Sequence, residues 1–272
     1  MEFLQPPTWR EALETRAAHP DALPIWGGTD VMVEMNFARK RPEALLDLTR
    51  VDELSRWSAE DGWFRIGAGV SYTRVIAELG SELPGLAIAS RTVGSPQIRN
   101  RGTIGGNLGS ASPAGDALPP LFAGGAEVEL ASARGSRRVP VDDFVTGPKR
   151  TCLGADELIT AVWMPRASGP QQFAKVGTRN AMVIAVCSFA LDLGTGRTCI
   201  GSAGPRPLRA HDAEAFLAQQ DSLSDDVAAR FGELVAAAAS PIDDVRGTAA
   251  YRRHALSVLA RRTLTWAWKE RG

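Results

Sequence analysis

Residues Gln97–Asp116, which read QIRNRGTIGGNLGSASPAGD, are the most informative stretch of the chain. The stretch places five glycines, several small hydroxyl residues and a final carboxylate close together. Glycine lacks the Cβ that keeps a ligand away from the main chain, and neighbouring glycines can turn their N–H groups toward one anion. A tight turn beside a sheet uses similar residues. The stretch by itself therefore leaves open a phosphate-binding loop and an ordinary turn.

A second glycine pair, in Pro24–Val31 (PIWGGTDV), favours the binding interpretation. A short apolar run ends in Gly27 and Gly28, and Val31–Met35 then has the character of a helix. A strand, a glycine turn and a helix present free N–H groups and the positive end of a helix dipole to phosphate. The segment is neither a Walker loop nor the GxGxxG pattern of a Rossmann unit. Two such segments, far apart in sequence, can hold one long diphosphate cofactor.

The two glycine segments together resemble the FAD-binding subunit of the molybdenum hydroxylases, which include xanthine dehydrogenase and carbon monoxide dehydrogenase. The resemblance covers essentially the whole chain and rests mainly on GGTD (27–30) and RNRGTIGGNLGSASPAGD (99–116). It implies an oxidoreductase subunit that carries FAD, while the molybdenum cofactor and the [2Fe-2S] clusters lie only on a large and a small partner subunit. Electrons would reach FAD from the iron–sulfur clusters and leave to NAD or another acceptor.

The residues expected to bind FAD come from the two glycine segments and from the resemblance. Backbone donors and helix ends would hold the diphosphate and the adjoining ribityl chain. The resemblance places Asp116 at cofactor hydroxyls and Lys175 at the flavin, with a helix cap and a solvated strand-edge lysine as the alternatives. No side chain is expected to act as acid, base or nucleophile, because the flavin supplies the redox chemistry. The expected cofactor-binding residues are Ile25, Trp26, Gly27, Gly28, Thr29, Asp30, Val31, Val93, Thr103, Ile104, Gly105, Gly106, Asn107, Asp116, Ile159 and Lys175.

The expected fold class is α+β. The resemblance implies a two-part FAD-binding region of the PCMH (vanillyl-alcohol-oxidase-like) type, followed by a C-terminal antiparallel sheet with helices. The expected domains are 1–165, divided at about residue 58 into a small α/β part and a larger part, and 170–272, as in carbon monoxide dehydrogenase flavoprotein subunits. Periodicity and capping residues predict the elements. Helices are expected at 8–18, 31–37, 71–79, 84–92, 210–219, 225–239 and 248–269, and strands at 24–26, 44–48, 63–68, 126–131, 137–141, 156–159, 173–176, 185–193 and 198–203.

Composition and charge exclude several other classes of protein. With 31 basic and 31 acidic residues, the formal net charge is zero, which gives no electrostatic reason to expect nucleic acid or an anionic membrane as a partner. No apolar run approaches the roughly 20 residues that span a bilayer, and no basic segment precedes an apolar one at the N-terminus. We therefore expect a cytoplasmic chain. No metal site is expected, since the cysteines and histidines are widely spaced: Cys152, Cys187, Cys199, His19, His211 and His254.

Two positions depart from the pattern of the resembling family. Trp26 stands where a small residue commonly precedes Gly-Gly, and Met182 stands where a tyrosine screens the flavin in carbon monoxide dehydrogenase-like members. The second departure favours a hydroxylase of a purine such as xanthine, or of another heterocycle, over the medium subunit of an aerobic carbon monoxide dehydrogenase. A stand-alone flavoenzyme of the same fold and a phosphate-binding module without redox output remain as alternatives. Arg99 and Arg101 are expected to be solvated.

Overall fold

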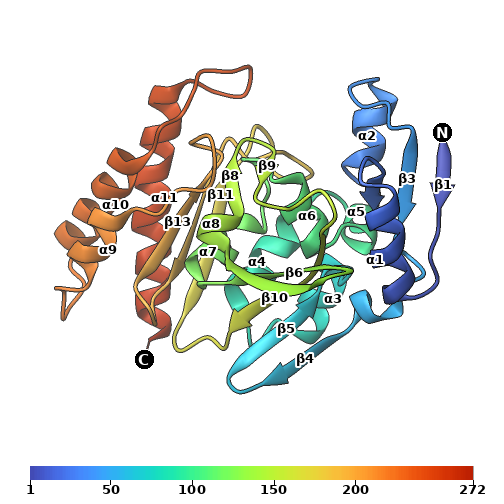
Figure 1. Ribbon diagram of the computed structural model, residues 1–272. Coiled ribbons are helices and arrows are strands. Elements are labelled where there is room, and N and C mark those ends of the chain that lie inside the picture. The colour runs from blue at the N-terminus through green and yellow to red at the C-terminus, as the bar shows by residue number, and fades with distance from the viewer. Residues whose placement is uncertain (272) are drawn as a thin grey trace.

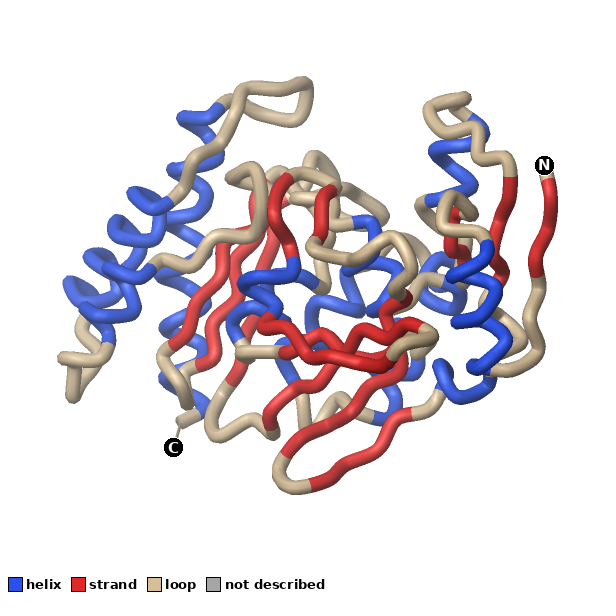
Figure 2. Tube along the Cα trace, in the orientation of Figure 1, coloured by secondary structure: helices blue, strands red, loops and turns tan. Residues whose placement is uncertain are grey.

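The computed structural model describes residues 1–271 and places three groups of strands side by side (Figures 1 and 2). The N-terminal group lies at the right of Figure 1, a larger sheet lies at the centre, and the C-terminal group with its long helices lies at the left. Each group has its own hydrophobic cluster. The mixture of helix and sheet confirms the predicted α+β class.

The N-terminal group is a small parallel sheet in the order β1-β3-β2. Helix α1 (Trp9–Ala18) begins at Thr8, whose hydroxyl oxygen accepts a hydrogen bond from the N–H of Glu11, as the sequence predicts. Helix α2 (Val31–Asn36) follows the first glycine pair, so the predicted strand, turn and helix are present. The remaining elements of this group are β1 (Glu2–Leu4), β2 (Leu23–Ile25), β3 (Ala44–Asp47) and the 3-10 helix η1 (Asp52–Ser55).

The central sheet is antiparallel, with the strand order β4-β5-β10-β6-β7. Strand β5 pairs antiparallel with both β4 and β10. Sequence reasoning missed β4, whose residues are mostly exposed and therefore show no apolar pattern. The strands are β4 (Trp57–Glu60), β5 (Trp63–Gly67), β6 (Glu127–Ser132), β7 (Gly135–Pro140) and β10 (Leu158–Pro165).

The glycine-rich stretch 97–116 is largely helical, which corrects the expectation of a loop. Ser95 and Thr103 each begin a helix by accepting a hydrogen bond from an N–H three residues later. Helix α6 packs closely on the segment that follows β5, since a Cβ at Gly105 would lie 2.5 Å from the Cβ of Ala68. The helices and small strands of this part are α3 (Tyr72–Glu78), α4 (Pro84–Thr92), α5 (Pro96–Arg101), α6 (Ile104–Ser110), α7 (Leu118–Ala123), α8 (Val141–Phe144), β8 (Val145–Gly147) and β9 (Arg150–Thr151).

The C-terminal group is the antiparallel sheet with helices that the sequence predicts, in the strand order β11-β12-β13. Phe189 of the sheet and Phe231 of α10 pack edge to face, with 6.1 Å between ring centroids. Helices α4 and α7 pack on the same sheet from the central part. The elements are β11 (Gln171–Val176), β12 (Cys187–Asp192), β13 (Arg197–Gly201), α9 (His211–Leu217), α10 (Asp225–Ala238) and α11 (Ala249–Glu270).

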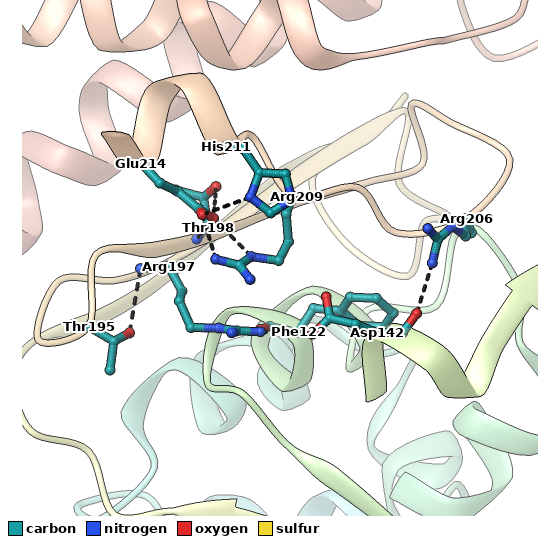
Figure 3. Close-up of polar contacts among 9 residues, drawn as sticks. All are labelled: Phe122, Asp142, Thr195, Arg197, Thr198, Arg206, Arg209, His211 and Glu214. Atoms are coloured by element: carbon teal, nitrogen blue, oxygen red, sulfur yellow. Dashed lines mark hydrogen bonds and ion pairs between the residues drawn. The ribbon is translucent and has the colours of Figure 1, made fainter. Parts of the chain in front are cut away.

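Polar contacts join the C-terminal sheet to the central part and to α9 (Figure 3). Arg197 donates to the carboxylate of Asp142 at 2.8 Å and to the carbonyl oxygen of Phe122 at 3.0 Å. The Glu214 carboxylate accepts from the N–H and the hydroxyl of Thr198 at 2.8 and 2.9 Å, and it pairs with Arg209. Burial raises the pKa of Glu214, but the hydrogen bonds from Arg209 and Thr198 outweigh it and hold that pKa below its usual range.

Replacing Glu214 with Gln should destabilise the chain by about 1–2 kcal/mol at pH 7, because Arg209 and Thr198 lose a charged acceptor. A carboxyl whose pKa is lowered on folding adds stability above its unfolded pKa, and this stability is lost as the pH falls through the folded value. The difference should therefore shrink below about pH 4. Urea unfolding across this pH range measures the loss of stability in Glu214→Gln. The control is Glu233→Gln, which removes an exposed ion pair on α10. Equal losses of stability in the two variants would contradict the prediction.

Candidate functional site

A cavity of ≈ 300 Å³ lies between the N-terminal group and the central part, where the two glycine segments meet. Residues of β2, α2 and the first glycine pair form one wall, and residues of α6 and β10 form the other. Most of the expected cofactor-binding residues line it, namely Ile25, Trp26, Gly27, Gly28, Thr29, Asp30, Val31, Val93, Thr103, Gly105, Gly106, Asn107 and Ile159. Ile104, Asp116 and Lys175 are not part of the lining.

The first glycine pair packs directly against the backbone that precedes α6. A Cβ at Gly27 would overlap the carbonyl group of Arg101, so only glycine fits there. Gly28 has φ = +73°, a left-handed conformation that other residues rarely adopt. The Arg101 side chain returns to the carbonyl oxygen of Trp26 at 3.3 Å, so this arginine ties the two segments together instead of only facing water.

The backbone N–H groups of residues 27–31 face no acceptor in the protein. None of these five consecutive donors makes a hydrogen bond to any atom of residues 1–271. Most buried backbone donors in proteins are paired, so an unpaired run beside a cavity requires water or a ligand as its partner. Successive N–H groups in a glycine turn form a concave anion site. The first segment therefore has the donors that a phosphate group needs.

The second segment contributes shape instead of free donors, which corrects the expectation that both segments supply N–H groups. The N–H groups of Ile104, Gly105 and Gly106 bond to Val70, Ala68 and the Thr103 hydroxyl respectively, at 2.9–3.3 Å. A Cβ at Gly106 would meet only the Thr103 hydroxyl oxygen, at 3.0 Å, and no other atom within 4 Å. Gly106 thus leaves the cavity open where any side chain would fill it.

Two polar side chains of the cavity wall are available to a ligand, one as a hydrogen-bond acceptor and one as a donor. The Asn107 side-chain oxygen is buried and has no hydrogen-bond partner among the described residues. Tyr72 also lines the cavity, and burial, followed by the charges of Asp116 and Asp30, raises the pKa of its hydroxyl well above the usual value. The phenol therefore stays protonated. An acceptor and a donor at these positions suit a ligand that carries hydroxyl groups.

Sequence reasoning missed Tyr72 and the basic residue Lys40, which both belong to the lining. Lys40 lies in the run Arg39–Arg41 after α2, and charge runs of this kind usually mark a solvated surface. Only the folding of the N-terminal group over α6 brings Lys40 to the cavity. Two contacts fix that placement: Ser110 donates to Asp30 at 2.6 Å, and Lys149 pairs with Glu34 of α2 at 2.7 Å.

Lys175 and Asp116 form a buried ion pair between β11 and the start of α7. The Lys175 ammonium lies 2.6 Å from the Asp116 carboxylate and also donates to the carbonyl oxygens of Thr92 and Val183, at 2.9 and 3.1 Å. The two alternatives for these residues fail, because Asp116 caps no helix and the lysine side chain is 9% exposed. Burial raises the pKa of Asp116 in spite of the lysine, and its second oxygen has no partner among residues 1–271.

The two departures from the family pattern have different surroundings. The indole of Trp26 packs on Gly69, where a Cβ would overlap the ring, so the larger side chain is accommodated by a glycine across from it. Met182 has φ = +48° and its side chain is 56% exposed. Arg179 donates to the Met182 carbonyl oxygen and holds this turn. Trp26 is therefore part of the cavity wall, and Met182 is on the surface.

The residues that the structure describes form no cluster of three or more His, Cys, Asp or Glu side chains suited to a metal ion. Across residues 1–271, no helix combines the length and the apolar character needed to cross a bilayer.

Family models and solved structures match the chain over nearly its full length. Residues 1–167 match the FAD binding domain in molybdopterin dehydrogenase, and residues 172–267 match the CO dehydrogenase flavoprotein C-terminal domain. A nicotine 6-hydroxylase medium subunit of Paenarthrobacter nicotinovorans is 32% identical, with 98% of this chain and 97% of that protein covered. A xanthine dehydrogenase FAD-binding subunit of Escherichia coli O157:H7 is 30% identical, with 96% and 93% covered.

Solved structures match the fold over the same length. A carbon monoxide dehydrogenase from Hydrogenophaga pseudoflava that lacks the Mo-pyranopterin moiety superimposes with a TM-score of 0.93, at 27% identity and with 100% of this chain and 98% of that chain covered. Quinoline 2-oxidoreductase from Pseudomonas putida 86 gives 0.92, at 26% identity, with 99% and 97% covered. The chain therefore belongs to the FAD-binding medium subunits of the molybdenum hydroxylase family, which are flavoprotein subunits of oxidoreductases.

Proposed function

We propose that this chain holds FAD in the cavity between the two glycine segments and relays electrons from an iron–sulfur partner subunit to NAD or another acceptor. The observation that carries the proposal is the run of unpaired N–H groups at residues 27–31, five residues that all line the cavity. When bound, FAD supplies the redox chemistry, and the protein supplies position and electrostatics.

The residues present fit a dinucleotide with a diphosphate and a hydroxylated chain. The N–H groups of residues 27–31 would hold the diphosphate, with Lys40 as the nearby cation of the lining. The unpaired oxygen of Asn107 and the protonated hydroxyl of Tyr72 would bond the hydroxyl groups. The volume of ≈ 300 Å³ is at the lower end of ligand pockets, so an extended cofactor would be only partly enclosed.

Asp116 and Lys175 would act at the flavin end, beyond the cavity wall. Lys175 already bonds the carbonyl oxygen of Thr92, and the next residue, Val93, lines the cavity. The unpaired oxygen of Asp116 remains free to accept from a cofactor hydroxyl. In the arrangement described, the ion pair is neutral as a unit, so an electrostatic effect of Lys175 on the flavin would be moderated by Asp116.

For the whole complex we propose a nitrogen heterocycle, such as a purine, as the hydroxylated substrate. Several relatives at 30–34% identity are named for such substrates, including nicotine, xanthine and nicotinate. The position of Met182, exposed and without an aromatic ring, agrees with this choice over carbon monoxide. The partners proposed are a large subunit with the molybdenum cofactor and a small subunit with [2Fe-2S] clusters, all in the cytoplasm.

Absorption spectroscopy of the purified chain tests whether it binds FAD. The chain, as isolated or after reconstitution, should show the visible bands of an oxidised flavin and one FAD per chain. A colourless protein that FAD cannot reconstitute would support the phosphate-binding module instead. Purification from the native host then separates the remaining alternatives: a chain that is isolated alone and still oxidises its own substrate is a stand-alone flavoenzyme, not a relay subunit.

Replacing Gly106 with Ala should weaken FAD binding by about tenfold while leaving the apo chain within about 1 kcal/mol of wild-type stability. The added methyl group would occupy the open side of α6, where Gly106 now borders the cavity. Fluorescence titration with FAD and urea unfolding of the apo chain give the two quantities. Gly154→Ala is a matched control: its Cβ would also meet a side-chain oxygen at 3.1 Å, but Gly154 is not part of the cavity lining. Similar FAD affinities of the two variants would show that Gly106 does not keep the cavity open for FAD.

Replacing Lys175 with Met should destabilise the chain by about 3 kcal/mol, since it leaves the buried Asp116 carboxylate without its partner. The double change Lys175→Met with Asp116→Leu should recover most of this loss, because no uncompensated charge remains. Reduction potentials of the bound flavin provide a second readout: the single variant should be harder to reduce than wild type, and the double variant should lie between them. Identical potentials in all three proteins would show that the pair is structural only.

A further inference from the structure

Four loops at one end of the molecule carry most of the large hydrophobic side chains that are exposed. Figure 1 shows these loops along its upper edge: α2 and the turn after it, the β8–β9 turn, the loop after β11 and the loop before α11. We call these segments, residues 31–41, 146–150, 178–184 and 240–248, the loop face. Its exposed hydrophobic residues are Met32, Val33, Phe37 (69%), Met182, Ile184, Ile242 (72%) and Val245 (102%).

Contacts join the four segments in two pairs. Lys149 of the β8–β9 turn pairs with Glu34 of α2, and its N–H donates to the carbonyl oxygen of Ala111 at the end of α6. The loop after β11 meets the loop before α11 through Arg252, which is 3% exposed and donates to the carbonyl oxygen of Val186 and to the Asp244 carboxylate. The first pair joins the N-terminal group to the central part, the second lies in the C-terminal group, and both lie along the upper edge of Figure 1.

Hydrogen bonds fix the backbone of two of the loops that carry the exposed side chains. Asp244 and Gly247 exchange two backbone hydrogen bonds of 3.2 Å, which fixes the turn that presents Val245. On the neighbouring loop, Lys175 donates to the Val183 carbonyl oxygen, between Met182 and Ile184. A backbone that is already fixed loses little entropy when a partner covers it. Exposed apolar residues gathered in this way are typical of an interaction site.

The loop face is also positively charged, although the chain as a whole has no net charge. No carboxylate of residues 1–271 lies within 4.0 Å of the cationic groups of its five unpaired basic residues, which are Arg39, Lys40, Arg41, Arg150 and Arg179. Its acidic residues already have partners within the chain: Glu34 pairs with Lys149, Asp244 pairs with Arg252, and Asp243 accepts from the N–H of Ala249. A partner with acidic groups would complement this surface.

We propose that the loop face is the docking surface for an electron-donating protein subunit whose facing surface is apolar at its centre and acidic at its rim. The inference rests on the proposed function, because a relay needs a donor protein near its cofactor. The loop face borders the cavity: Lys40 and Val31 belong to both. This continuity favours a protein that exchanges electrons with the cofactor over an anionic membrane, the other surface that such chemistry would suit.

Footprinting of the native complex tests where the partner lies. A tag at the C-terminus, which lies at the opposite edge of the molecule in Figure 1, allows purification without disturbing the loop face. Hydroxyl radicals should oxidise Phe37 and Met182 at least about fivefold more slowly in the complex than in the isolated chain. Trp266 of α11 is an exposed control that should react equally in both. Equal oxidation of Phe37 and Met182 in the two samples would overturn the inference.

Variants test the same surface by affinity, with the iron–sulfur subunit separated from the native complex as the probe. Phe37→Asp and Val245→Asp should each weaken its binding to the holo chain by about tenfold, and Trp266→Asp should not. All three positions are exposed, so unfolding midpoints and FAD content should match wild type. Binding by wild type should weaken as salt is added.

Unchanged affinity of Phe37→Asp and Val245→Asp for the iron–sulfur subunit would refute the docking surface. Strong binding of wild type to phosphatidylserine vesicles that these two variants lose, with subunit affinity intact, would assign the loop face to a membrane instead. Failure of the proposed function is distinguishable from both results, since it would be seen as a chain that binds no FAD in the first place.

Discussion

The close approach of Gly27 to the carbonyl group of Arg101 is the constraint on which the rest of the site depends. Any side chain at position 27 would push the N-terminal group away from the central part, and the cavity between them would lose its wall. The residues around this approach, 27–31, line the cavity, and their N–H groups have no acceptor in the described chain. One steric requirement thus produces both the shape and the donors of the site. The contacts of Asp30 with Ser110 and of Glu34 with Lys149 then hold the two walls in register.

Backbone donors also explain how a chain with no net charge can offer an anion site. A glycine turn supplies partial positive charge without a lysine or arginine that would have to be desolvated. The cations of the chain are consequently free for other places, and several of them lie around the loop face. Binding of the cofactor and docking of a partner would therefore use mostly different sources of positive charge, with Lys40 common to both. Added salt should weaken the second more than the first, because surface charges are screened more strongly than a partly enclosed site.

The sequence predicted what local chemistry determines. Thr8 begins α1, the first glycine pair lies between β2 and α2, and the C-terminal helices and sheet follow their periodicity. What it missed depends on contacts between distant segments. Nothing around Lys40 or Tyr72 indicates a cavity, because each reaches it only through packing of one part on another. The N–H groups of Gly105 and Gly106 were expected to be free, but the glycine-rich stretch folds as a helix whose first turn bonds to the segment after β5 and to Thr103.

The ion pair of Lys175 with Asp116 is one such contact between distant segments. The lysine comes from the C-terminal sheet and the aspartate from the central part, and the lysine also holds the Val183 carbonyl oxygen in the loop face. A buried pair of this kind contributes little net stability over apolar residues, but loss of one partner is costly. Its value is therefore positional, because three separate segments share a single ammonium group, and one of them continues into Val93 of the cavity wall. A movement of the loop after β11, such as docking of a partner could cause, would have to rearrange the hydrogen bonds of that group. The surface where we place the partner and the region where we place the flavin are then coupled through one side chain.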